Sequence, residues 1–139
     1  MQHFLQISIS LASLEPKSYR DKLLGVEAAY KKEQIDRHRD FIDFMVPDEG
    51  RLDRLKRRGD TDALKRIFEG DRGAIKQLQK EIETTERYIA NVQASATMNS
   101  LQKRVETEIS QIYLSDLKLA LADAERLYYR YVPSNQRSI

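Results

Sequence analysis

The chain of 139 residues contains no cysteine and no tryptophan, only five glycines and three prolines, and no long uninterrupted run of apolar residues. A chain without cysteine has no disulfide bonds and no thiol chemistry, which fits a reducing compartment, so we expect a cytoplasmic location. No apolar run approaches the roughly 18 residues of a transmembrane helix, so we expect no membrane span. The first residues carry no basic group ahead of an apolar stretch, so we expect no secretory signal.

Helix-forming residues dominate what the sequence does contain. Hydrophobic residues make up 40% of the chain and charged residues 33%, with Ala, Leu, Glu, Lys, Arg and Gln prominent. This composition is typical of a helical globular protein. A chain of this length can bury roughly two-thirds of its unfolded surface in one core. We therefore expect residues 1–139 to form a single all-α domain.

Apolar periodicity and capping residues divide the chain into its expected elements. They predict an N-terminal segment over 1–15, a helix over 16–46, two short helices within 48–70, a helical hairpin of 72–97 and 100–131, and a loose tail over 133–139. The helix over 72–97 has a narrow apolar seam like that of a coiled coil. We expect an antiparallel bundle of three long helices, in which the two short helices connect the first to the second.

Two parts of this division stay open. In the N-terminal segment, Leu5, Ile7 and Ile9 alternate with polar residues as in a strand, whereas Phe4 and Ile7 also fit a helical stripe. Residues 95–100 are small and prone to capping, which favours a turn over one continuous helix. A continuous rod would need a partner to cover both of its apolar faces.

Capping residues delimit the two short helices. Asp48 can cap the first helix, which Gly59 would end, and Asp60 or Thr61 can cap the second, which Gly70 would end. Glycine followed by aspartate at both helix ends indicates shared capping chemistry rather than an ancestral repeat.

Five basic residues gather in the first short helix: Arg51, Arg54, Lys56, Arg57 and Arg58. Seven acidic residues lie in the same region, 48–73, so the stretch creates no long-range positive field. Leu52 and Leu55 lie on the other face of the expected helix. A solvated helix face is the favoured interpretation, and contact with phosphate groups or an acidic partner is the alternative.

The last helix carries more apolar surface than one neighbouring helix can cover. Beyond Ile112 a further apolar line forms a candidate protein interface: Leu114, Leu117, Leu121, Ala124, Tyr128 and Tyr131. The first helix, the N-terminal segment or another chain would have to cover this line, because large exposed apolar patches are unusual in a monomer. Core packing and a protein interface both stay open.

The sequence shows no catalytic constellation. It has no nucleophile motif and no Glu-x-x-His pair of the carboxylate-bridged metal bundles. His38 lies near Asp36, Asp40 and Asp43, but on a helix these aspartates share one face and His38 points about 160° away from Asp36. We interpret His38 as a histidine at the edge of the core rather than a metal ligand or a base. We expect no enzymatic activity, no metal and no cofactor.

Two classes of function fit these features. We expect a non-enzymatic helical protein–protein interaction module, such as an adaptor, inhibitor or assembly subunit, whose partner is another protein or a second copy of the chain. The alternative is a nucleic-acid-associated helical protein that uses residues 51–58. Salt distinguishes the two classes, because phosphate contacts weaken steeply with ionic strength and apolar helix packing does not.

Overall fold

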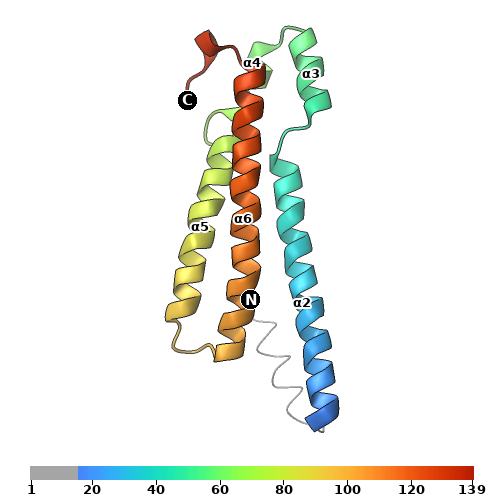
Figure 1. Ribbon diagram of the computed structural model, residues 1–139. Coiled ribbons are helices and arrows are strands. Elements are labelled where there is room, and N and C mark those ends of the chain that lie inside the picture. The colour runs from blue at the N-terminus through green and yellow to red at the C-terminus, as the bar shows by residue number, and fades with distance from the viewer. Residues whose placement is uncertain (1–15) are drawn as a thin grey trace.

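A computed structural model describes residues 16–139, which form α-helices and one short 3-10 helix and no strand (Figure 1). The elements are α2 (Pro16–Met45), α3 (Glu49–Arg57), α4 (Thr61–Phe68), α5 (Ala74–Ala94), α6 (Ser100–Tyr131) and the 3-10 helix η1 (Ser134–Gln136). The all-α bundle of three long helices with two short connecting helices is therefore confirmed. Segment 1–15, for which helix and strand both stayed open, lies outside the described residues.

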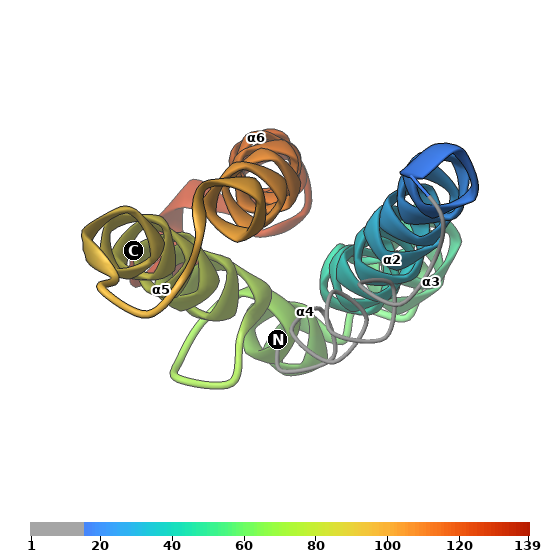
Figure 2. The same cartoon turned by 90° about the horizontal axis from the view of Figure 1, so that it is seen from below.

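The three long helices alternate in direction along the chain. α5 and α6 form an antiparallel hairpin, and α6 is flanked by α5 on one side and α2 on the other (Figure 2). Glu27 of α2 pairs with Arg104 of α6, and His38 stacks on Tyr113. The residue numbers rise together along this pair, so α2 and α6 run parallel.

A turn separates α5 from α6 at residues 95–99. The side chain of Asn99 accepts a hydrogen bond from the Gln102 amide (2.9 Å), and the Gln102 side chain accepts one from the Asn99 amide (2.8 Å). This reciprocal capping box satisfies amides at the start of α6. The Ser95 hydroxyl accepts hydrogen bonds from the amides two and three residues later. These local bonds exclude the continuous rod, and α5 ends at Ala94, earlier than predicted.

The short helices begin and end where the capping residues predicted. Asp48 and Asp60 each accept a hydrogen bond from the amide three residues later, at 3.1 and 3.2 Å. Gly59 and Gly70 have φ angles of 69° and 81°, in the left-handed region that other residues rarely adopt. These two glycines let the chain reverse without strain after α3 and α4.

The main core lies where α3 and α4 cover the hairpin of α5 and α6. Its buried residues are Leu52, Leu55, Leu64, Phe68, Ile75, Leu78, Tyr113, Leu117, Ala120, Ala124, Leu127, Tyr128, Tyr131 and Val132. Each short helix supplies two large side chains to this cluster. Full burial of one such leucine or phenylalanine contributes about 1.5–3 kcal/mol, so the short helices are held by packing and not only by their caps.

The tail after α6 is docked, which corrects the prediction of a loose tail. The Arg137 guanidinium donates hydrogen bonds to the carbonyl oxygens of Tyr129 (2.7 Å) and Val132 (2.9 Å). The amide of Ser138 donates to a carboxylate oxygen of Glu69 (3.2 Å). The last carbonyls of a helix lack partners within the helix, and here the tail supplies donors to them.

Candidate functional site

The chain itself covers most of the apolar line that was predicted as a candidate interface on α6. Four of its six residues are buried in the main core: Leu117, Ala124, Tyr128 and Tyr131. Leu114 and Leu121 are half-buried. α2, α3, α4 and α5 supply the side chains that pack against the line. In the folded chain this line therefore belongs to the core, and a partner would need a different surface.

The two buried tyrosines of that line end in hydrogen bonds. The Tyr128 hydroxyl donates to Glu69 (2.5 Å), and the Tyr131 hydroxyl donates to Asp53 (2.6 Å). Burial, helped by the bond to Glu69, raises the pKa of Tyr128. The hydrogen bond to Asp53 raises the pKa of Tyr131. These bonds fasten the C-terminal part of α6 to α3 and to the end of α4.

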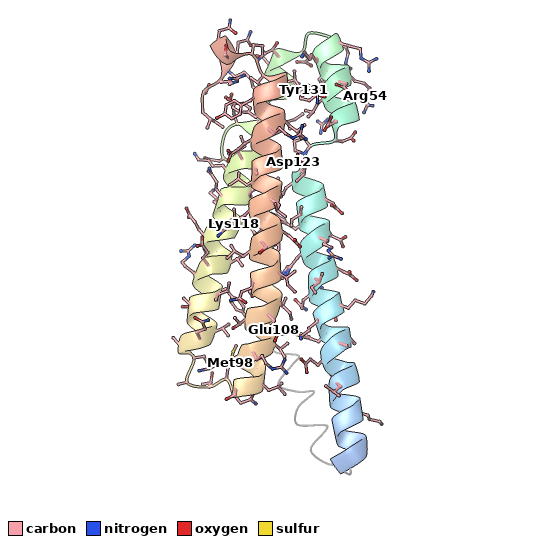
Figure 3. The ribbon with its side chains drawn as sticks, in the orientation of Figure 1. Arg54, Met98, Glu108, Lys118, Asp123 and Tyr131 are labelled. Atoms are coloured by element: carbon pink, nitrogen blue, oxygen red, sulfur yellow. The ribbon has the colours of Figure 1, made fainter. Side chains whose placement is uncertain are left out.

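The basic residues of 51–58 lie on the exposed side of α3, where Figure 3 labels Arg54. Leu52 and Leu55 are buried beneath them. Lys56 lies above the ring of Tyr131, with its Nζ atom 5.7 Å from the ring centre. Asp53, held by Tyr131, interrupts the basic residues along the helix. The stretch forms one charged face of a short helix rather than a convergent pocket.

An open groove of about 590 Å³ lies between α2 and α6. Its lining residues are Arg39, Ile42 and Asp43 from α2, Val46 directly after the end of α2, and Asp116, Leu119, Ala120 and Asp123 from α6. Ile42 and Val46 also pack against the main core, and Ala120 is part of it, so they form an apolar floor. Leu119 is 70% exposed in the middle of α6. We call this feature the α2–α6 groove.

The α2–α6 groove carries more negative than positive charge. Three aspartates and one arginine line it. Asp123 projects from α6 toward the end of α2 and pairs with Arg126 at 2.7 Å (Figure 3). Asp43 and Asp116 have no ion-pair partner among the described residues. Arg39 also has no ion-pair partner among the described residues, so the groove holds two unpaired carboxylates and one unpaired guanidinium. A partner that enters the groove therefore meets a net negative charge.

Sequence reasoning did not select Leu119 as a site residue. A shared seven-residue spacing of apolar residues in the two helices could have identified it. Ile112 precedes Leu119 by seven residues, and Ile35 precedes Ile42 by seven. This interval keeps side chains on one helix face. Ile112 is also exposed (43%), so the apolar strip beside the groove continues toward the start of α6.

A smaller cavity of about 160 Å³ lies among α2, α5 and α6. Its lining residues are His38, Glu81, Thr84, Thr85, Tyr88, Ser110 and Tyr113. His38 stacks on Tyr113 with the ring centres 3.7 Å apart and the planes 10° apart. Its Nδ1 atom is buried without a hydrogen-bond partner in the described structure, and burial lowers the pKa of His38. Burial thus favours the neutral form of the ring, which lies at the edge of the core as the sequence predicted.

Beside this cavity, Glu106 joins three helices. Its carboxylate is almost fully buried and accepts hydrogen bonds from Tyr30 of α2 and from Tyr88 of α5 (2.9 Å). Burial raises the pKa of both tyrosines. Both oxygens of Glu106 are engaged in these bonds, so the residue acts as a clamp among α2, α5 and α6. Sequence reasoning missed this glutamate, because no local pattern distinguishes it from an exposed one.

The described residues offer few other sites. Within 16–139 no group of three or more metal-binding side chains is placed to hold an ion, and none of the helices in that range is long and apolar enough to cross a bilayer. Comparison with protein-family models, curated proteins and solved structures found no match to the chain. The function must therefore be inferred from the residues themselves.

Proposed function

We propose that the protein is a non-enzymatic helical protein–protein interaction module that binds its partner in the α2–α6 groove. One observation carries the proposal: Leu119 is 70% exposed beside an apolar floor. A partner that buried this side chain would gain about 1.5–3 kcal/mol from that burial. The floor belongs to the main core, so the groove exists before a partner arrives and no ordering is needed to form it.

The proposal is tested by placing a photo-activated cross-linking residue at position 119 in the protein in its source cells. The matched control carries the same residue in place of Phe44, which is 84% exposed on α2 but does not line the groove. We expect a discrete adduct from position 119 and none from position 44. An adduct with a second copy would identify self-association, which the sequence left open. Equal adducts from both positions, or none from position 119, would contradict the proposal.

The nucleic-acid alternative is supported by a separate observation. Arg51, Arg54, Arg57 and Arg58 are exposed and form no ion pair with any other described residue. Their guanidinium groups are therefore available to phosphate. Binding of DNA or RNA that falls steeply with salt would favour this alternative over the groove.

The expected cytoplasmic location stays a prediction, which fractionation of the source cells would test.

A further inference from the structure

We infer that the occupant of the α2–α6 groove is an amphipathic helix of a separate partner protein, with leucine-like side chains on one face and lysine or arginine beside them. This inference rests on the proposed function and specifies the chemistry of the partner. It depends on the length of the groove, on its charge, and on which helices of the chain itself could occupy it.

The length of the groove fits two turns of a helix. The lining residues run from Arg39 of α2 to Val46, which directly follows the last residue of α2, and from Asp116 to Asp123 on α6, which is seven residue steps on each side. At 1.5 Å per residue this corresponds to about 11 Å. The two helices run parallel along this length, so a third helix can lie between them and insert apolar side chains spaced three and four residues apart. Ile112, which lies four residues before Asp116, would extend the contact by about one further turn.

The charge of the groove selects the polar residues of the occupant. Asp43 and Asp116 lie beside the apolar floor without ion-pair partners in the described chain. Asp40 is exposed and lies on the same face of α2 as Asp43. A lysine or arginine that flanks the inserted side chains would pair with these carboxylates. A partly exposed pair changes affinity by about 1.4- to 5-fold, so two or three pairs discriminate clearly between a basic and an acidic helix.

The chain itself offers no comparable occupant among its described helices. Two copies that met symmetrically through this groove would bring the same acidic rims together, because a two-fold interface pairs a surface with itself. The basic helix α3 of another copy could supply positive charge. Its leucines, Leu52 and Leu55, are buried in the main core and cannot insert into a groove. Segment 1–15, which lies outside the described residues, contains no lysine or arginine to pair with the aspartates. The charge of the groove therefore favours a different protein as the occupant.

The probe that tests this inference is a synthetic helical peptide of about 18 residues, long enough to form a helix on binding. It carries leucines at intervals of three and four on one face and lysines elsewhere. A matched peptide carries glutamates in place of the lysines. We expect the lysine peptide to bind the intact protein at least tenfold more tightly than the glutamate peptide in fluorescence anisotropy at physiological salt.

Three variants locate the binding. Leu119→Gln should weaken the lysine peptide about tenfold, because the buried anchor is lost. Asp43→Asn combined with Asp116→Asn should weaken binding of the lysine peptide about fivefold. The difference in affinity between the lysine and glutamate peptides should become smaller. Phe44→Gln, which removes an exposed apolar side chain outside the groove, should leave binding unchanged. Circular dichroism of each variant checks that the helices are retained.

The outcomes separate the inference from the function on which it rests. Equal affinity for the two peptides, or no effect of the aspartate substitutions, overturns the basic partner while leaving the groove in place if Leu119→Gln still weakens binding. If Leu119→Gln leaves the affinity for the lysine peptide unchanged, the groove is not the binding site. Absence of any binding by the lysine peptide overturns the inference, and cross-linking from position 119 then decides whether the groove binds something else.

Discussion

Different forces hold the two ends of the bundle. At the end that carries α3 and α4, side chains from several helices form one apolar cluster, in which Phe68 and Leu117 are fully buried. At the opposite end, the apolar cluster has three buried members among the residues that the structure describes: Tyr30, Val105 and Ile109. The first end can therefore rely on burial, which is favourable in any orientation, while the second needs contacts with defined geometry.

Charged and hydrogen-bonded side chains supply those contacts between α2 and α6. Lys31 pairs with Glu27 (3.2 Å) and Glu108 (2.6 Å), and Arg104 pairs with the same two carboxylates at 3.1 and 3.3 Å. The hydrogen bond from Lys31 holds the pKa of Glu108 below its usual value. Each partly exposed ion pair contributes little to stability. The buried carboxylate of Glu106 would be costly to bury without the hydrogen bonds from its tyrosine partners. We therefore expect the N-terminal half of α2 to open more readily than the end that carries the groove.

The largest expected effect comes from removing a side chain at the apolar end. Phe68→Ala should reduce the free energy of unfolding by about 3–5 kcal/mol, because it leaves a cavity in a site with no exposure. Phe44→Ala is the matched control at an exposed position and should change stability by no more than about 0.5 kcal/mol. Urea unfolding measures both. Similar losses in the two variants would show that the apolar cluster does not hold this end.

At the polar end, Glu106→Ala removes the carboxylate that accepts hydrogen bonds from Tyr30 and Tyr88. We expect a loss of about 2–4 kcal/mol, and a smaller loss in Glu106→Gln, which keeps one acceptor oxygen. Hydrogen exchange should rise mainly in residues 24–37, while α3 and α4 keep their protection. Faster exchange in α3 and α4 to the same degree would mean that the two ends are not held separately.

Protonation of His38 should have a smaller effect on the free energy of unfolding. Burial lowers its pKa in the folded state, so as the pH falls the unfolded chain binds a proton first and the free energy of unfolding decreases. The loss should begin near pH 6.5, the usual pKa of histidine, and continue below it. The facing groups are Glu81, Tyr88 and Tyr113, and burial raises the pKa of each.

The His38→Phe variant isolates this contribution, because it keeps a ring stacked on Tyr113 and leaves Glu81, whose raised pKa acts in the opposite direction, unchanged. Urea unfolding at pH 7 and pH 5.5 should show a larger drop in stability for the wild type than for the variant. Equal drops in the two proteins would assign the pH dependence to other groups.

The smallest effect on stability is expected from the basic face of α3. Replacing Arg51, Arg54 and Arg58 together with Glu should leave the fold intact, because surface changes usually stay within about 0.5 kcal/mol each. Mobility-shift measurements with DNA and RNA at physiological salt complete the comparison. Tight binding by the wild type that the triple variant loses would favour the nucleic-acid alternative.

Local signals predicted the fold well, but not which apolar side chains of α6 are exposed. Capping by Asp48 and Asp60 acts within one helical turn, so sequence alone located the short helices. Leu117 and Leu119 look equally apolar in the sequence, yet Leu117 is fully buried and Leu119 is 70% exposed. The difference depends on where α2, α3 and α4 fold back over α6, which is a long-range property. The burial of Glu106 depends on the same packing.

The central claim, that the α2–α6 groove is the binding surface, is tested most directly by titrating the isotope-labelled protein with the lysine-bearing peptide and following backbone amide shifts by NMR. The account predicts that the largest changes gather in residues 39–46 and 116–123, which line the groove. Residues 27–34, at the polar end, and the basic stretch 51–58 should change little. Largest changes in 51–58 or around Glu106 would contradict the claim.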